Sequence, residues 1–570
     1  MVPMASARTT RRRPARPGDV VGKVAAGAIG ALLLTACSPS GMTVRPNPET
    51  SGTPALVVGT TERIGSLDPA GPTDPASALV QAQVLPTLLR QSDAGGDAIP
   101  DLAETAEFTA PDEYTVTLPG GLHWANGHEL TSSDVAFSID RLREIDDPNG
   151  AAALLERVTD VDTPNAQTIV FTLVDDDDES FPLALTGAAG TVVDEEVFAP
   201  DALTPDRDIV DADAFGGAYR ITSWDSEGLV EFTPYIDGAR TQRDDGDDEE
   251  GQDGEDQEDQ DEQEEDASPR GVVILTRFDT SENLALALRQ GDVDVAFRGL
   301  SPADLAAARG GASQSVIEGP VRDVHALALG GDGPPPAVRE AIALLVDRDE
   351  LARAGYSGLD APLFAFLPDE VEGSLDLFRT GDVDGAGGPD AAQAREALDA
   401  AGIPLPVDLE ITVDAAYAGD PIRDVLRVLE AQLERDGLFA VELTEPAPAT
   451  PSPTPTITAT PTATPNPTRT ASPTPAERSA PPVFARSVVP DSADPLATLL
   501  PFLRLDDRAP TQQGDLDLGA LQRRLAADAV AIPLLQGAQT AVVRDGVTGV
   551  TLDGSARLRF EQIRFAANGG

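Results

Sequence analysis

Two histidines five positions apart, His123 and His128, are the first side chains whose types and spacing could do chemistry. Imidazole nitrogens are common zinc ligands, so this pair could supply half of a metal site. The chain has only three histidines, and no third histidine or cysteine lies near the pair. We therefore predict no metal. Nucleophilic catalysis is excluded in the same way, because no histidine stands in a triad or G-x-S-x-G context. The sequence predicts no catalytic residues, no cofactor and no enzyme.

The only cysteine, Cys37, ends the run Leu34-Thr35-Ala36-Cys37 behind a segment typical of export signals. Basic residues come first, and the apolar stretch from Val24 to Leu34 is too short to span a bilayer. Small residues before a cysteine resemble the lipobox of bacterial lipoproteins, in which that cysteine is acylated. We predict a signal peptide over 1–36 and a lipid anchor at Cys37, on the extracytoplasmic face of the cell membrane. An ordinary secreted protein with a chance cysteine is the alternative, and Sec and Tat export both stay open.

Composition narrows the choice of partners. The formal net charge is −56 over 570 residues, which argues against nucleic acid because phosphate binding needs clustered Lys and Arg. Lys23 is the only lysine and falls inside the predicted signal, so Schiff-base and P-loop chemistry are excluded. A single cysteine excludes a disulfide framework. With 41% hydrophobic residues, a chain of this length can build more than one core.

Two stretches cannot join those cores. Acidic residues make up 16 of the 23 residues from Asp244 to Asp266, with no apolar residue among them, which predicts a disordered insert over 243–268. Repeated Thr-Pro and Ser-Pro steps predict a second disordered insert, extended and solvated, over 446–482. Its threonines could carry O-linked sugars, and a plain spacer is the simpler interpretation.

Between these stretches, short apolar strands alternate with amphipathic helices, which indicates an α/β protein. Thr131 and Asp134 supply N-cap chemistry for one helix, and a short helix is expected from Asp194 to Phe198. The other elements are expected as strands at 55–59, 114–118, 169–173, 272–275, 293–296, 325–329 and 409–413, and as helices at 281–290, 337–345, 421–435 and 521–527.

Several short motifs follow one another along these elements. They are Leu67-Asp68-Pro69, Leu122 to Thr131 with Asp134 and Arg141, Gly216-Gly217-Ala218-Tyr219 with Trp224, Gly291-Asp292-Val293-Asp294, Val338 to Ile342 with Asp347-Arg348, and Gln432-Leu433 with Gly437. In this order they resemble the solute-binding proteins of peptide and nickel ABC importers, solute-binding family 5.

The resemblance implies a two-lobed, periplasmic-binding-protein-like α/β fold of type II, with three domains and a discontinuous first domain. A solute bound between the lobes closes them, and the closed form, expected to be a monomer, delivers it to an ABC permease. After the signal and a tether over 37–54, domain I would take 55–85, 206–320 and 529–570, domain II 86–205, and domain III 321–528.

The resemblance also implies a binding site. Val488 to Pro495 is similar to a Trp-x-x-Asp-x-x-Asp-Pro segment that gives peptide binders an aromatic wall and a carboxylate for the peptide amine. Asp491 stands at the carboxylate position, and a buried ammonium does need a charge partner. Val488 stands where the tryptophan would be, and Ser66 beside the first loop is the other substrate-binding position expected. A solvated loop acid is the alternative interpretation of Asp491.

A further resemblance is to the actinobacterial branch of this family, which includes a mycobacterial lipoprotein that regulates lipoarabinomannan synthesis. Its members are similar in a Pro/Thr-rich insert in the third domain and in an ending like Ile532-Pro533-Leu534-Leu535-Gln536. The first expectation is a receptor that binds a small, peptide-like solute for import. The alternative is a regulatory lipoprotein of envelope glycolipid synthesis that uses the same fold without transport.

Overall fold

The structure is a computed structural model. It describes residues 55–71, 74–92, 96–147, 150–176, 178–225, 228–235, 271–329, 333–354, 360–379, 389–413, 420–444, 483–488, 490, 492, 494–503, 517–555 and 557–565. The predicted signal, tether and both inserts lie outside the described residues, as do Cys37 and Asp491.

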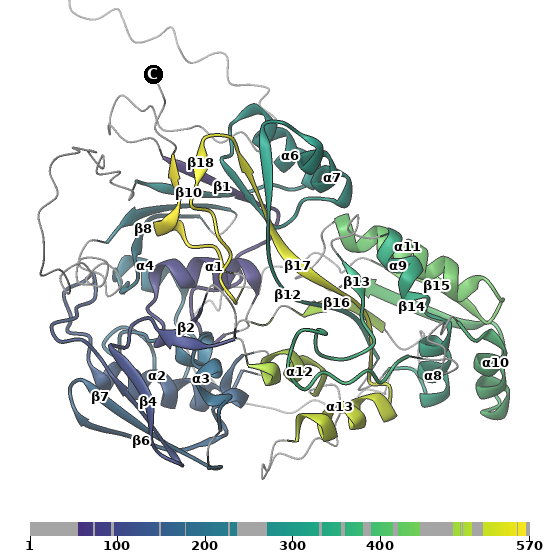
Figure 1. Ribbon diagram of the computed structural model, residues 1–570, viewed down its shortest axis with the longest axis horizontal. Helices are drawn as coiled ribbons and strands as arrows, with labels where there is room; N and C mark the ends of the chain where they lie inside the picture. The colour runs from purple at the N-terminus through teal and green to yellow at the C-terminus, as the bar shows by residue number, and fades with distance from the viewer. Residues whose placement is uncertain are drawn as a thin grey trace, which may run out of the picture. The chain divides into compact units, whose positions relative to one another are not determined.

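One large sheet of 11 described strands runs through the protein (Figure 1). From one edge to the other its order is β15 (Phe439–Thr444), β14 (Val407–Val413), β16 (Val483–Val488), β12 (Gln314–Ala328), β17 (Ala531–Arg544), β11 (Val295–Phe297), β1 (Leu56–Thr60), β10 (Val273–Arg277), β9 (Leu229–Pro234) and β8 (Tyr219–Asp225), and β13 (Ala361–Pro362) also pairs with β17.

The long antiparallel pair of β12 and β17 joins the two halves of this sheet. Gln314 to Glu318 pair with the C-terminal end of β17, and Val324 to Ala328 pair with its N-terminal end. The register shifts between Glu318 and Val321, between Val321 and Asp323, and again between His325 and Ala326. Beyond the pair, β16 adds to β12 and β11 adds to β17. Among the described strands, the two halves therefore meet through this pair alone, at the point where its register is irregular.

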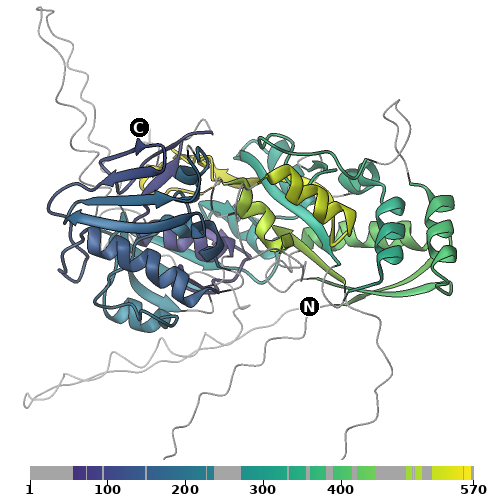
Figure 2. The ribbon, with the colours of Figure 1, turned by 90° about the horizontal axis from the view of Figure 1, so that it is seen from below.

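The remaining elements cover the sheet or form smaller ones. A four-stranded sheet has the order β4 (Thr105–Ala110), β5 (Glu113–Thr117), β7 (Thr168–Leu173) and β6 (Val158–Asn165), and helix α2 lies against it (Figure 2). Two-stranded sheets pair β2 (Leu89–Gln91) with β3 (Ala98–Pro100) and β18 (Val547–Thr548) with β19 (Arg564–Phe565).

The described helices are α1 (Pro75–Val84), α2 (Ser132–Ile145), α3 (Phe181–Ala184), α4 (Asp206–Asp211), α6 (Ser281–Gln290), α7 (Pro302–Gly310), α8 (Pro336–Leu345), α9 (Arg348–Ala354), α10 (Ala391–Ala400), α11 (Asp420–Glu434), α12 (Pro495–Leu503) and α13 (Leu518–Ala527). Single 3₁₀ turns add η2 (Ala152–Leu155), η3 (Ala188–Gly190) and η5 (Phe560–Gln562).

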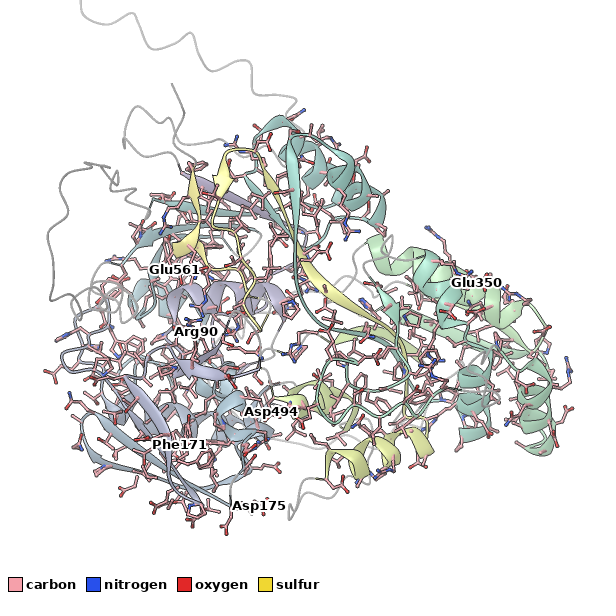
Figure 3. The ribbon with its side chains drawn as sticks, viewed as in Figure 1. Arg90, Phe171, Asp175, Glu350, Asp494 and Glu561 are labelled. Atoms are coloured by element: carbon pink, nitrogen blue, oxygen red, sulfur yellow. The ribbon has the colours of Figure 1, made fainter. Side chains whose placement is uncertain are left out.

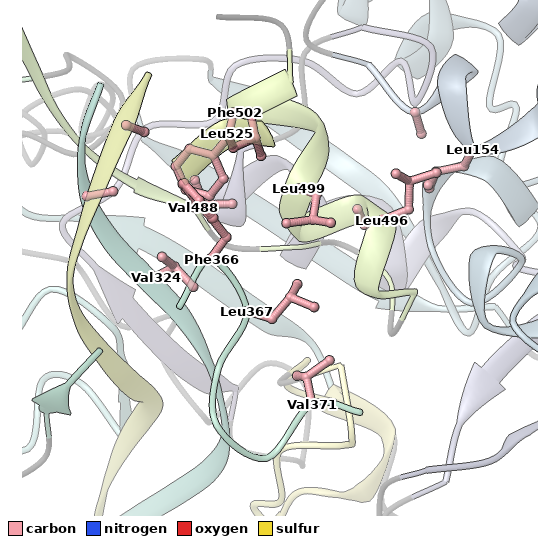
Figure 4. Close-up of a cluster of buried hydrophobic side chains, with 14 of the residues drawn as sticks. Leu154, Val324, Phe366, Leu367, Val371, Val488, Leu496, Leu499, Phe502 and Leu525 are labelled. Carbon is pink, nitrogen blue, oxygen red and sulfur yellow. The ribbon is translucent and has the colours of Figure 1, made fainter. Parts of the chain in front are cut away.

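Strand β1 is buried on both faces, which explains its unbroken apolar sequence. Val58 belongs to a hydrophobic cluster with α1, β8 to β10 and Phe560. Val57 points into a second cluster, built with α6 and α7. The largest cluster contains the four-stranded sheet, including Phe171, together with β14, α8 and α11 to α13. Figure 4 shows part of it, where Phe366 and Phe502 pack beside Val488.

Most of the expected elements are confirmed. Helix α6 spans the predicted residues because Thr280 caps its start and Gly291, at φ 78°, ends it in the left-handed conformation. The short helix expected from Asp194 to Phe198 is wrong: the amides of Val197 and Phe198 both donate to the Asp194 carbonyl, which closes one isolated turn. The strand expected at 325–329 is part of β12, which is much longer.

Candidate functional site

The first motif residue, Asp68, forms a buried ion pair with Arg141 of α2. The two guanidinium nitrogens Nη1 and Nη2 donate to the two carboxylate oxygens at 2.8 and 2.6 Å. The carboxylate also accepts from the amides of Ala70 and Thr204, and Arg141 reaches the Ala202 carbonyl at 2.8 Å. Both side chains are at most 2% exposed. The pair therefore fastens the loop after β1 to helix α2.

The second motif contains the N-terminus of helix α2 and a tryptophan packed beside it. Thr131 and Asp134 form a capping box at the N-terminus of α2. Trp124 is fully buried and its indole nitrogen lies 3.3 Å from the Asp134 carboxylate. Its ring packs against Gly216 so closely that a Cβ there would lie 2.8 Å from the ring. Burial raises the pKa of Asp134 to about 6. Trp124 is a core residue.

Other motif residues hold the backbone in the same way. The buried Asp294 carboxylate accepts from the Val57 amide at 2.8 Å and from Arg544. Arg348 donates to the carbonyls of Leu363 and Pro533, and burial lowers its pKa to about 10. These contacts tie β1, β11 and β17 together on one side and α9 to β17 on the other.

The structure surrounds His128 with two carboxylates that sequence spacing did not suggest. Its Nδ1 lies 2.9 Å from Asp194 Oδ2 and 2.8 Å from Glu196 Oε2. The hydrogen bond to Asp194 raises the pKa of His128. One histidine and two carboxylates could hold a metal ion. At these distances His128 Nδ1 is within hydrogen-bond reach of both carboxylates. His123 lies apart, with Nδ1 2.8 Å from the Gly121 carbonyl oxygen.

Ser66 is half-buried in the loop after β1. Its hydroxyl accepts from the Asp68 amide at 3.0 Å, its amide donates to Ser77 at 3.0 Å, and its carbonyl accepts from Gln81 at 3.1 Å. The loop is thus fixed against α1 before any ligand is considered. A ligand contact by Ser66 stays a prediction.

Val488 lies in a different part of the protein. It pairs with Val324 of β12 and is 5% exposed, within the hydrophobic cluster of Figure 4. The structure therefore places Ser66 and Val488 against different elements, and no described contact joins them. Asp491, the expected amine-binding residue, is outside the described residues.

A cluster of buried charged residues lies where β12 and β17 lose register, and sequence reasoning missed it. We call Glu62, Arg298, Asp323, His325 and Asp360 the crossover cluster. Arg298, at φ 59°, donates to Glu62 at 2.6 Å and to Asp323 at 3.1 Å. The Asp360 carboxylate lies 3.8 Å from His325 Nε2. No sequence signal predicts this cluster, because its members come from four separate segments.

Burial controls protonation in the crossover cluster. Burial, and then the positive charge of Arg298, lowers the pKa of His325 to about 4. Burial raises the pKa of Asp323 and raises the pKa of Asp360 well above its ordinary value. Gly537 lies directly against Asp360, since a Cβ at position 537 would lie 2.5 Å from Asp360 Oδ1.

The sheet order, the long crossing strand pair and the covering helices define a mixed α/β fold of the type II periplasmic binding proteins. The chain belongs to the bacterial extracellular solute-binding proteins, family 5, whose family model matches residues 97–508. As in that family, it is a binding protein that works outside the cytoplasm, and it is not an enzyme. No curated protein matches the sequence.

Solved structures share this fold at low sequence identity. A dipeptide-binding protein of Pseudoalteromonas sp. SM9913 in complex with Met-Leu has a TM-score of 0.66 at 15% identity, over 90% of this chain and 100% of that one. Haemophilus influenzae OppA in complex with RPPGFSPFR has a TM-score of 0.68 at 14% identity, over 90% and 99%. The Escherichia coli murein tripeptide binding protein MppA has a TM-score of 0.66 at 14% identity, over 90% and 99%. Within the described residues, no helix is long and apolar enough to cross a membrane.

Replacing Asp68 by Ala leaves the Arg141 guanidinium buried without its carboxylate. We expect the free energy of unfolding to fall by about 3–5 kcal/mol, measured by denaturant titration. The matched control is Asp211→Ala, which breaks the exposed pair of Arg207 and Asp211 at 3.8 Å and should cost less than about 1 kcal/mol. Equal losses in the two variants would contradict a stabilising role for the buried pair.

The crossover cluster predicts a pH dependence. His325 is neutral in the folded protein and takes up a proton in the unfolded chain below its ordinary pKa of 6.5. Stability from this residue is complete above pH 6.5 and is lost as the pH falls toward 4, by up to about 3 kcal/mol. The pKa values of Asp323 and Asp360 are raised in the folded protein, so these two carboxyl groups change the stability with pH in the opposite direction.

The comparison that isolates the histidine is between the wild type and His325→Gln. Denaturant unfolding at pH 7 and at pH 4.5 should show a larger loss of stability in the wild type than in the variant. If both proteins lose the same free energy over this range, His325 is not the group responsible.

Proposed function

We propose that this protein is a lipid-anchored receptor that captures a small, peptide-like solute between two lobes and delivers it to an ABC permease. One observation carries the proposal. The two halves of the large sheet are joined by β12 and β17, and the pair loses its register in the middle. A two-strand connection with an irregular centre can bend while the packed bodies at its ends stay rigid.

We propose the domain boundaries that the family resemblance implies. One lobe would contain domain I, over 55–85, 206–320 and 529–570, together with domain II over 86–205. The other would contain domain III over 321–528. The clusters around Val57 and Val58 support domain I, since nearly all their residues fall inside its three segments. A solute that makes more contacts when the lobes are together shifts the population toward the closed form.

Recognition of the solute would depend on acidic groups. We assign the peptide ammonium to Asp491, because an ammonium taken out of water needs a charge partner. The relatives with bound Met-Leu and RPPGFSPFR support a peptide-like solute, and a net charge of −56 favours a cationic end group. Acylation at Cys37 would keep the receptor beside its permease.

One observation favours the alternative, a regulatory lipoprotein of the same fold that does not transport. Val488 stands where peptide binders have an aromatic wall, and its side chain is packed in the hydrophobic core. A site without that wall offers a peptide less contact area. In that case the lobes would serve an envelope protein or glycolipid instead of an importer.

A thermal-shift screen with a broad library of dipeptides and tripeptides tests the first function. A peptide present at 100 times its Kd adds about 2.7 kcal/mol of stability and raises Tm. Asp491→Ala should remove the shift, whereas the control Asp545→Ala, an exposed acid after β17, should keep it. A library that leaves Tm unchanged rules out peptide binding and favours the regulator. A shift that survives in Asp491→Ala shows that another group binds the amine.

A further inference from the structure

Two buried side chains far apart in sequence meet between domain II and domain III. Arg157 follows η2, and Asp494 directly precedes α12. Arg157 Nη2 lies 2.7 Å from Asp494 Oδ2, and the two side chains are 6% and 2% exposed. Figure 3 shows Asp494 at the end of α12 nearest the elements of domain II. This ion pair is therefore a contact between the proposed lobes.

Each partner is held in place by its own domain. Arg157 Nη1 also donates to Ser180 at 2.8 Å and to Asp178 at 3.2 Å, both in the segment between β7 and α3. The other oxygen of Asp494 accepts from the Leu496 amide at 2.8 Å at the start of α12. Neither charge has to be reoriented when the domains come together, so the pair is preorganised.

Apolar side chains surround the ion pair and keep water out. Leu154 of η2 and Leu496 of α12 are 1% and 2% exposed and belong to one hydrophobic cluster. Figure 4 shows these two side chains side by side. A pair buried in this way gains little net free energy, because removing both charges from water offsets their attraction. Removing Arg157 is costly, because Asp494 then stays buried without a cation beside Asp178. Removing Asp494 costs less, because Arg157 keeps its pair with Asp178 at 3.2 Å.

We propose that Arg157 and Asp494 form a latch between the lobes, in which Arg157 permits Asp494 to be buried when the lobes close. When the lobes separate, each charge regains water, so the intact pair leaves opening and closing nearly balanced. When Arg157 is missing, closing buries Asp494 without a cation, and the open form dominates. When Asp494 is missing, Arg157 still has Asp178 as its partner, and the shift toward the open form is smaller. The latch rests on the proposed two-lobed function.

The latch is also next to the proposed solute site in the chain. Asp494 comes three residues after Asp491, the carboxylate assigned to the solute ammonium. One short segment would thus provide both the solute's charge partner and the latch.

Pulsed electron–electron double resonance tests the latch. The full chain carries Cys37→Ser, and spin labels are attached at Ala166→Cys in the exposed turn between β6 and β7 and at Arg523→Cys on α13. We expect Arg157→Ala to shift the distribution toward long distances, with the closed-to-open ratio at least tenfold lower, and Asp494→Ala to shift it less, because Arg157 keeps its pair with Asp178. Asp494→Asn, which keeps the shape and loses the charge, should shift it in the same direction.

Two controls separate the latch from simple damage. The double variant Arg157→Met with Asp494→Leu replaces the pair by apolar side chains and should restore the short distances. Glu350→Gln breaks the exposed pair with Arg435, at 2.9 Å, and should change nothing; Figure 3 labels Glu350. If two distance populations are present and the single variants do not change their ratio, the latch is wrong and the hinge stands. One fixed distance in every variant would overturn the hinge and the latch together.

Discussion

The antiparallel pairing of β12 with β17 is the constraint on which the rest of the structure depends. It connects a half-sheet built around β1 with one built around β14 and β16, and it is the one described strand pair that does so. The pairing is regular over Gln314 to Glu318, whereas its register shifts three times between Glu318 and Ala326, where Asp323 and His325 of the crossover cluster lie. Backbone hydrogen bonds thus fix each end to its own body. The centre is left with side-chain contacts, which are easier to rearrange.

The motif residues that suggested the family hold parts of the backbone together. Asp68 with Arg141, and Asp294 with Val57 and Arg544, join segments distant in sequence, and Trp124 with Asp134 is a buried local contact at the start of α2. Such contacts tolerate little substitution, because a buried charge without its partner destabilises the fold. The solute-contacting positions have no such restriction. This difference explains why the motifs identify the fold and say little about the solute.

Local chemistry allowed much of the fold to be predicted. Helices α2 and α6 could be placed because Thr131, Thr280 and Gly291 mark their ends, and β7 could be placed from its alternating apolar residues. The length of β12 could not, because Gly319 and Pro320 normally interrupt a strand, whereas here they sit at a register shift. The crossover cluster and the pair of Arg157 with Asp494 were also missed. Both exist only after segments from different parts of the chain have packed, and no spacing in the sequence encodes that.

Amide hydrogen exchange along β12 and β17 tests the central claim most directly, since it measures local opening of these two strands. The account predicts that amides at the centre of the pair, over 319–325 and 535–539, exchange faster than those of the flanking segments 314–318 and 326–328. It also predicts that conditions favouring closed lobes slow the central amides selectively. Uniformly slow exchange along both strands would show one rigid sheet, and the hinged receptor would have to be abandoned.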